Sequence, residues 1–246
     1  MTKEFKKIQE NIKKLAFKLL HGYSSFYIYD KLMSLKAPNI VGIQEAKINR
    51  ATMNRYKDFF NSTIYAHKIC FLLILSHFFD VEKQSRPNNT RSLFQLKNNA
   101  SRQREKFTAE AFLASNPDRK YIESLAEGYK GISAEDITEI DQLLDQNKPL
   151  LKKLKDFRDT KLCHYDMRET NTPLTIEEAK QLFQLAEKIL NKISQKLSHE
   201  SWLFRHTDTE AERYTTLVID HLTRFEPYRK KEIDKKFQKL KKQSSH

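Results

Sequence analysis

The clearest helical pattern of this chain lies in residues 133–157, SAEDITEIDQLLDQNKPLLKKLKDF. Residues 133–136 are a strong helix start, because a serine followed three positions later by an acidic residue is typical of a helix N-terminus. Pro149 predicts a bend or break near residues 147–148. Beyond the start, apolar residues recur at helical spacing: Ile140, Leu143, Leu144, Leu150, Leu151, Leu154 and Phe157.

Most of the remaining chain also has helical spacing. Residues 3–36 are expected to form one long helix, or a broken pair if Gly22 interrupts it. A helix from about residue 51 to 81, apolar nearly all round in its later half, is expected to lie in the core. Thr175 and Glu178 have the form of a capping box. Further helices are expected over residues 92–99, 101–114, 117–127, 175–197 and 208–228.

Composition supports an all-α fold. The 246 residues include only 4 Gly and 6 Pro, which favours long helices with short connections. No internal repeat or long linker is evident, so we expect a single all-helical domain over residues 1–246, with a basic C-terminal segment at 229–246.

Charge and cysteine content indicate partners and location. Lys and Arg number 45 against 32 Asp and Glu, a net charge of +13, and such a positive surface attracts polyanions such as RNA or DNA. The same charge could serve solubility alone. Cys70 and Cys163 have no paired spacing, the N-terminus lacks an apolar signal segment, and the apolar run at 69–79 is too short to cross a bilayer. We expect a cytoplasmic protein with no membrane partner.

The stretch 157–166, FRDTKLCHYD, places an arginine, carboxylates and a histidine at the end of the patterned helix. At about 100° per residue, Arg158 points toward the apolar stripe, where a buried guanidinium needs a carboxylate, a phosphate or a partner chain. His164 lies about 120° around the helix and about 9 Å along its axis, so the two side chains of one regular helix do not converge.

This stretch resembles the R-x(4-6)-H motif of the HEPN superfamily. The resemblance is closest to the AbiU-type abortive-infection family, whose motif is close to R-D-K-x-x-A-H. Thr160 replaces the usual lysine and Cys163 the usual alanine. A second likeness lies upstream, where residues 76–80 (SHFFD) precede a polar turn and residues 90–93 (TRSL). The resemblance implies a HEPN-like helical bundle, here with additional N-terminal and C-terminal helices.

The resemblance also implies an activity, metal-independent RNA cleavage at a composite site formed by two chains. His164 would transfer the proton, and Arg158 would stabilise charge on the phosphoryl oxygens. Asp159 would orient His164 or Arg158. Lys161 and Tyr165 are candidates for RNA contact. The expected partners are RNA, a second copy of the chain, and an antitoxin or other defence-system protein.

Two other functions remain open. Arg158 could pair with Asp156, Asp159 or a distant glutamate while His164 only packs or caps; the protein would then be a non-catalytic HEPN-like dimer that binds RNA or protein. Alternatively, it is a helical scaffold whose charge keeps it soluble. No His, Cys, Asp or Glu cluster has convincing ligand spacing, and no phosphate-binding glycine loop occurs, so neither metal nor cofactor is expected.

Overall fold

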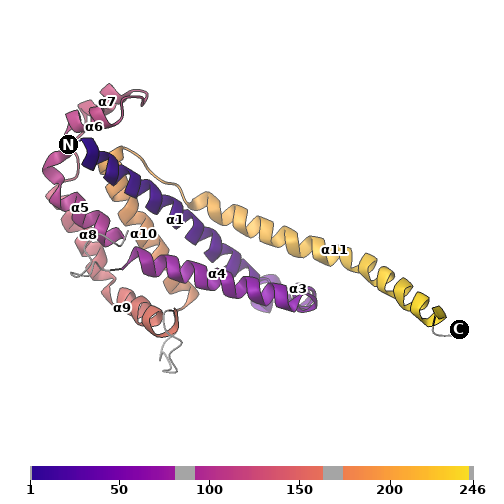
Figure 1. Cartoon of the computed structure of the whole chain (residues 1–246). Helices are drawn as coiled ribbons and strands as arrows, with labels where there is room; N and C mark the ends of the chain where they lie inside the picture. Colours follow the sequence, from indigo (N-terminus) through magenta and orange to yellow (C-terminus); the bar gives the residue numbers. More distant parts are fainter. Residues whose placement is uncertain (1, 81–91, 163–173, 244–246) are drawn as a thin grey trace. The chain divides into compact units, whose positions relative to one another are not determined.

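The computed structural model describes residues 2–80, 92–162 and 174–243. Every regular element in these ranges is a helix (Figure 1). The all-α fold expected from composition and periodicity is therefore confirmed.

The first helix, α1 (Thr2–Ser34), is continuous through Gly22. A Cβ atom at this position would lie 2.8 Å from Cε1 of Phe183 and 2.9 Å from Cγ2 of Ile74. Real Cβ atoms do not tolerate such distances, so the glycine permits close approach of these side chains. Of the two alternatives expected for residues 3–36, the single long helix is correct.

Three helices follow α1 along the chain. They are α2 (Pro38–Val41), α3 (Ile43–Arg55) and α4 (Lys57–Phe78), so the helix expected to begin near residue 51 is in fact split at Tyr56. Asn49 Nδ2 donates to the Leu35 carbonyl at 3.1 Å, and Arg50 Nε donates to the Lys36 carbonyl at 2.8 Å. These contacts hold α3 against the end of α1, and local periodicity did not reveal them.

The later part of α4 is only partly enclosed. Phe71, Leu75 and Phe78 are buried, as expected, whereas Leu73 is 45% exposed. By length and composition alone, α4 is long and apolar enough to cross a membrane. An 18-residue window of this helix has a mean hydropathy of 1.3 and is one-third buried. Core helices of soluble proteins also meet these two criteria of length and composition. The apolar run at residues 69–79 is too short to cross a bilayer, but the whole helix begins 12 residues earlier, at Lys57, and is long enough.

The middle of the chain consists of short helices. Side-chain hydroxyls of Ser92 and Thr108 cap the starts of two of them, accepting from Gln95 and Ala111 backbone N–H groups. The helix expected over residues 101–114 is divided, and the one expected from 117 begins later. The elements are α5 (Leu93–Arg102), the 3-10 turn η1 (Arg104–Lys106), α6 (Ala109–Ser115) and α7 (Ile122–Glu127).

The patterned segment forms α8 (Ala134–Gln146) and α9 (Lys148–Phe157), with the expected break just before Pro149. Ser133 and Asp136 form a capping box at the start of α8. After α9 comes η2 (Arg158–Leu162), a π-helical turn. Thr175 and Glu178 form the expected capping box of α10 (Ile176–Ser198).

The chain divides into two compact units. The first contains Met1–Ser24 and Ile69–His206, and the second contains Ser25–Lys68 and Thr207–His246. In the first unit α10 is the main core helix, and its Phe183 ring stacks on Tyr23 at a centroid distance of 4.6 Å. Helices α1 and α4 contribute residues to both units. Units that share continuous helices can fold as one domain, so the single domain stays a prediction.

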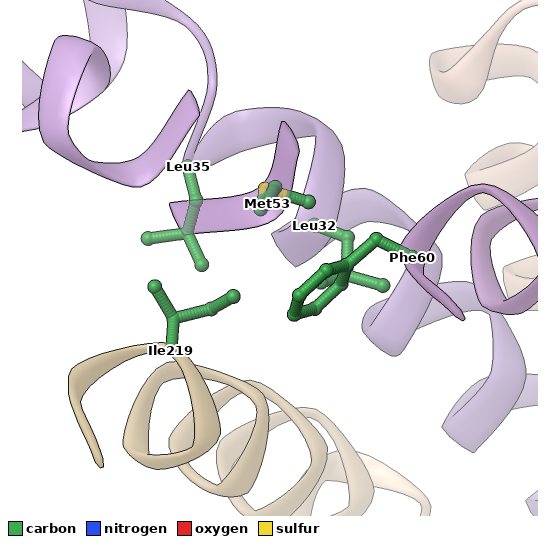
Figure 2. Close-up of a cluster of buried hydrophobic side chains, with 5 residues drawn as sticks. All are labelled: Leu32, Leu35, Met53, Phe60 and Ile219. Atoms are coloured by element: carbon green, nitrogen blue, oxygen red, sulfur yellow. The ribbon is translucent and has the colours of Figure 1, made fainter. Parts of the chain in front are cut away.

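In the second unit, α11 (Arg205–Gln243) packs on the helices α1, α3 and α4 through a cluster of buried apolar side chains (Figure 2). Thr52 and Thr223 hydroxyls lie 3.0 Å apart, and Arg55 Nη1 lies 2.6 Å from Glu226 Oε2. The expected end of this helix at residue 228 is wrong, because α11 continues to Gln243. The cluster consists of Leu32, Leu35, Met53, Phe60 and Ile219.

Candidate functional site

The candidate site begins where α9 ends. Leu154, 2% exposed, anchors the inner face of α9, and Lys153 Nζ lies 2.7 Å from both carboxylate oxygens of Glu178. The ion pair between Lys153 and Glu178 links α9 to the first turn of α10. It lowers the pKa of Glu178, chiefly through the hydrogen bond from Lys153. Arg158 therefore follows a helix fixed by both apolar packing and an ion pair.

Residues Arg158–Leu162 form the π-turn η2. The hydroxyl of Thr160 donates to the Asp156 carbonyl at 2.7 Å. In an α-helix this carbonyl accepts from the backbone N–H of residue 160, so the threonine hydroxyl competes for the same acceptor. Single π-turns within helices are rare and are frequent at functional sites. The local backbone irregularity therefore coincides with the start of the R-x(4-6)-H motif.

Arg158 is held by two carboxylates from different parts of the chain. Its Nη1 donates to Asp80 Oδ1 and its Nε to Asp159 Oδ1, both at 2.8 Å. The Arg158 side chain is 19% exposed, against 28% for Asp80 and 48% for Asp159. The sequence predicted that the guanidinium would need a carboxylate, a phosphate or a partner chain. Asp159 was among the partners considered, and Asp80 was not.

The charges around Arg158 do not cancel. Burial of the guanidinium favours its neutral form, but the hydrogen bonds and charges of Asp159 and Asp80 outweigh burial and raise the pKa of Arg158. Among the described side chains, two carboxylates around one guanidinium give this cluster a formal charge of −1. A phosphate that binds Nε of Arg158 must displace Asp159 from it.

Several predicted site residues cannot be placed. His164 and Tyr165 lie outside the described residues, as does Cys163. Lys161 is described only through the backbone of η2. The expected divergence of Arg158 and His164, and the contacts expected for Lys161 and Tyr165, therefore stay predictions.

Asp80 is the site residue that sequence reasoning missed. It lies two residues after the C-terminal end of α4 and 78 positions before Arg158. The signal was present in the resemblance, since Asp80 ends the upstream segment SHFFD. Local periodicity cannot pair two residues so distant in sequence, so the contact was visible only in the fold.

One comparison with known proteins identifies the family. The family model HEPN_AbiU2, described as AbiU2, matches residues 4–216. This chain belongs to the AbiU2 family of HEPN proteins. The match includes Asp80 and Arg158 and ends within α11. Membership indicates a HEPN-type function associated with abortive infection.

The other comparisons add no relative, since no curated protein and no solved structure matches the chain. Within the part of this AbiU2 protein that the structure describes, no group of three His, Cys, Asp or Glu side chains could hold a metal ion. The described site therefore consists of one guanidinium and two carboxylates, at a π-turn.

Proposed function

We propose that this AbiU2 protein is a metal-independent endoribonuclease of a bacterial antiviral-defence or toxin-antitoxin system. The observation that carries the proposal is the fixed position of Arg158, which two carboxylates hold at a π-turn within the family-matched region. A guanidinium with a defined orientation can stabilise charge on a phosphoryl group without reorganising during the reaction.

The proposed reaction uses the RNA's own 2′-hydroxyl. His164 accepts its proton as the 2′-oxygen forms a bond to the adjacent phosphorus, and the bond to the 5′-oxygen breaks. The departing 5′-oxygen takes up a proton, and a 2′,3′-cyclic phosphate remains on the other fragment. A histidine with an ordinary pKa of about 6.5 can serve in either transfer near neutral pH.

The two carboxylates have separate proposed roles. Asp80, the less exposed, fixes the direction of the Arg158 fork from across the unit, whereas Asp159 holds Nε and is nearly half exposed. Within the described part of the chain, two hydrogen bonds engage the guanidinium, and three of its five N–H donors have no acceptor there. We propose that RNA phosphate uses these donors, with Lys161 supplying further positive charge and Tyr165 a stacking or hydrogen-bonding surface.

The active form is proposed to be a homodimer, because the HEPN resemblance implies a composite site to which two chains contribute. Two chains whose motifs face one cleft would supply both groups. The protein would act in the cytoplasm, without metal or cofactor, and an antitoxin or defence-system partner would restrain it. Light scattering at high micromolar concentration tests the dimer, and a strict monomer contradicts the composite site.

The decisive experiment is cleavage of a mixed RNA pool in EDTA by the wild type, Arg158→Ala and His164→Ala. We expect cyclic-phosphate ends with the wild type and a loss of cleavage of about 100-fold or more in each variant. Lys155→Ala is the matched control, since it removes an exposed positive charge from the same helix. If all four proteins cleave equally, the activity belongs to a contaminant or to another site.

A non-catalytic binding function is the second candidate, and the net negative charge of the Arg158 cluster favours it. In that case Arg158, Asp80 and Asp159 serve only to connect α4 with η2. Absence of cleavage by every protein, together with RNA or protein binding by the folded dimer, would support this function over the enzyme.

A further inference from the structure

The last turns of α11 carry an apolar stripe beyond the part of the chain that it packs against. At about 100° per residue, Ile233, Phe237 and Leu240 fall within about 60° of the helix circumference. Phe237 is 62% exposed and Leu240 is 60% exposed. We call these three residues the terminal stripe. All of it lies after residue 216, where the AbiU2 family match ends.

The terminal stripe continues a face that is already used for helix packing. On the same arc of α11, Ile219 is 1% exposed in the buried cluster, and Leu222 packs against that cluster. The stripe is thus the extension of a helix-packing face past the described side chains of the second unit that pack on it. A narrow apolar stripe on a helix is the form that pairs with one other helix.

The charges beside the stripe select its partner. Lys236 borders one side of the terminal stripe and Lys230 the other, both exposed. Around them the helix is strongly basic, since residues 229–243 hold eight Lys or Arg and two Asp or Glu. In paired helices the side chains beside the apolar seam determine partner choice, with opposite charges favoured.

We propose that the terminal stripe binds an acidic amphipathic helix of a partner protein, with apolar residues on its seam and Glu or Asp beside them. This inference goes beyond the proposed nuclease activity and does not depend on it. A second copy of the chain fits poorly, because the same lysines would face one another. RNA phosphate needs no apolar stripe, and lipid surfaces favour a wider apolar face than about 60°.

The test uses the full-length protein and a synthetic peptide of about three heptads, with Leu or Ile on the seam and Glu beside it. Fluorescence anisotropy at physiological salt measures binding. We expect the double variant Phe237→Ser/Leu240→Ser, which keeps the charge, to bind at least about tenfold more weakly than the wild type. Circular dichroism should show the same helicity, because both side chains are exposed.

The matched control is Lys231→Ser/Lys235→Ser, which removes two charges from the opposite arc and keeps the terminal stripe. We expect it to weaken binding by no more than about threefold. A peptide with Lys in place of Glu should not bind. Equal losses in the two double variants would overturn the proposal, because the attraction would then be that of any polyanion.

Two further outcomes would also overturn it. If the wild type binds vesicles containing phosphatidylglycerol through the stripe and does not bind the peptide, the occupant is a lipid surface. If the peptide does not bind and the stripe variant loses self-association, the occupant is a second copy.

Discussion

Arg158 Nη1 lies 2.8 Å from Asp80 Oδ1, and this contact joins the end of α4 to the first residue of the π-turn. The two residues are 78 positions apart. Each belongs to one of the two segments in which the sequence resembles AbiU-type proteins. Two segments that appear independent in the sequence are therefore one structural feature of the folded chain.

The first prediction concerns the energy of this ion pair. In a double-mutant cycle with Asp80→Asn and Arg158→Gln, we expect a coupling of about 1 kcal/mol in the free energy of unfolding, because both side chains are partly exposed. Urea denaturation measures it. The control cycle pairs Arg158→Gln with Asp145→Asn, an exposed carboxylate of α8, and should give no coupling. No coupling in the first cycle would mean that the contact contributes nothing to stability.

The second prediction concerns Gly22. Gly22→Ala places a Cβ atom against Phe183 and Ile74, and we expect a loss of about 1–3 kcal/mol in the free energy of unfolding, although alanine has the higher helix propensity. Gly128→Ala is the matched control, with no atom within 4 Å of the added Cβ, and should change stability by less than about 0.5 kcal/mol. Urea denaturation tests both. A stabilised Gly22→Ala variant would contradict the close packing.

The third prediction tests the cluster of the second unit. Ile219 is 1% exposed and its neighbour Val218 is 47% exposed. Ile219→Ala should lower the free energy of unfolding by about 2–4 kcal/mol through lost burial and the cavity left behind. Val218→Ala should lower it by less than about 0.5 kcal/mol. Similar effects of the two changes on the urea midpoint would show that α11 does not pack through Ile219.

The fourth prediction is a pH dependence at the start of α8. Burial opposes the charge of Asp136, but its hydrogen bonds with the Ser133 backbone and with Lys196 outweigh burial and lower the pKa of Asp136. A carboxylate with a lowered pKa stabilises the fold above its unfolded pKa of about 3.9, and this contribution is lost as the pH falls below that value.

Asp136→Ala should therefore lower the free energy of unfolding by about 1 kcal/mol at pH 7, and by less at pH 3. Asp145→Ala, in the last turn of the same helix, serves as the control and should show little effect at either pH. Thermal or urea denaturation across this pH range measures the difference. An Asp136→Ala effect that does not change with pH would show that charge is not involved.

The boundaries that could be predicted from the sequence are those that local chemistry determines. Ser133, Pro149 and Thr175 each act within one turn, and the structure confirms a helix boundary at each of them. The all-α class followed from composition and periodicity, and the family from two short motifs.

The features that sequence reasoning missed depend on contacts between distant residues. The last helix was expected to end near residue 228, before the basic segment, whereas α11 continues to Gln243. In the structure Glu226 accepts two hydrogen bonds from Arg229 and pairs with Arg55, which holds the turn around Pro227. The Asp80 contact was likewise inaccessible to a pattern read along one helix.

The π-turn has a consequence for how this motif changes in evolution. A π-turn contains one more residue than the α-helical turn it replaces, so a helix can accommodate one inserted residue within such a turn. Deletion of one residue within η2 would restore an α-helical turn and change the motif spacing by one, without removing Arg158. Families that carry an arginine and a histidine four to six residues apart can thus differ by insertions that the helix absorbs locally.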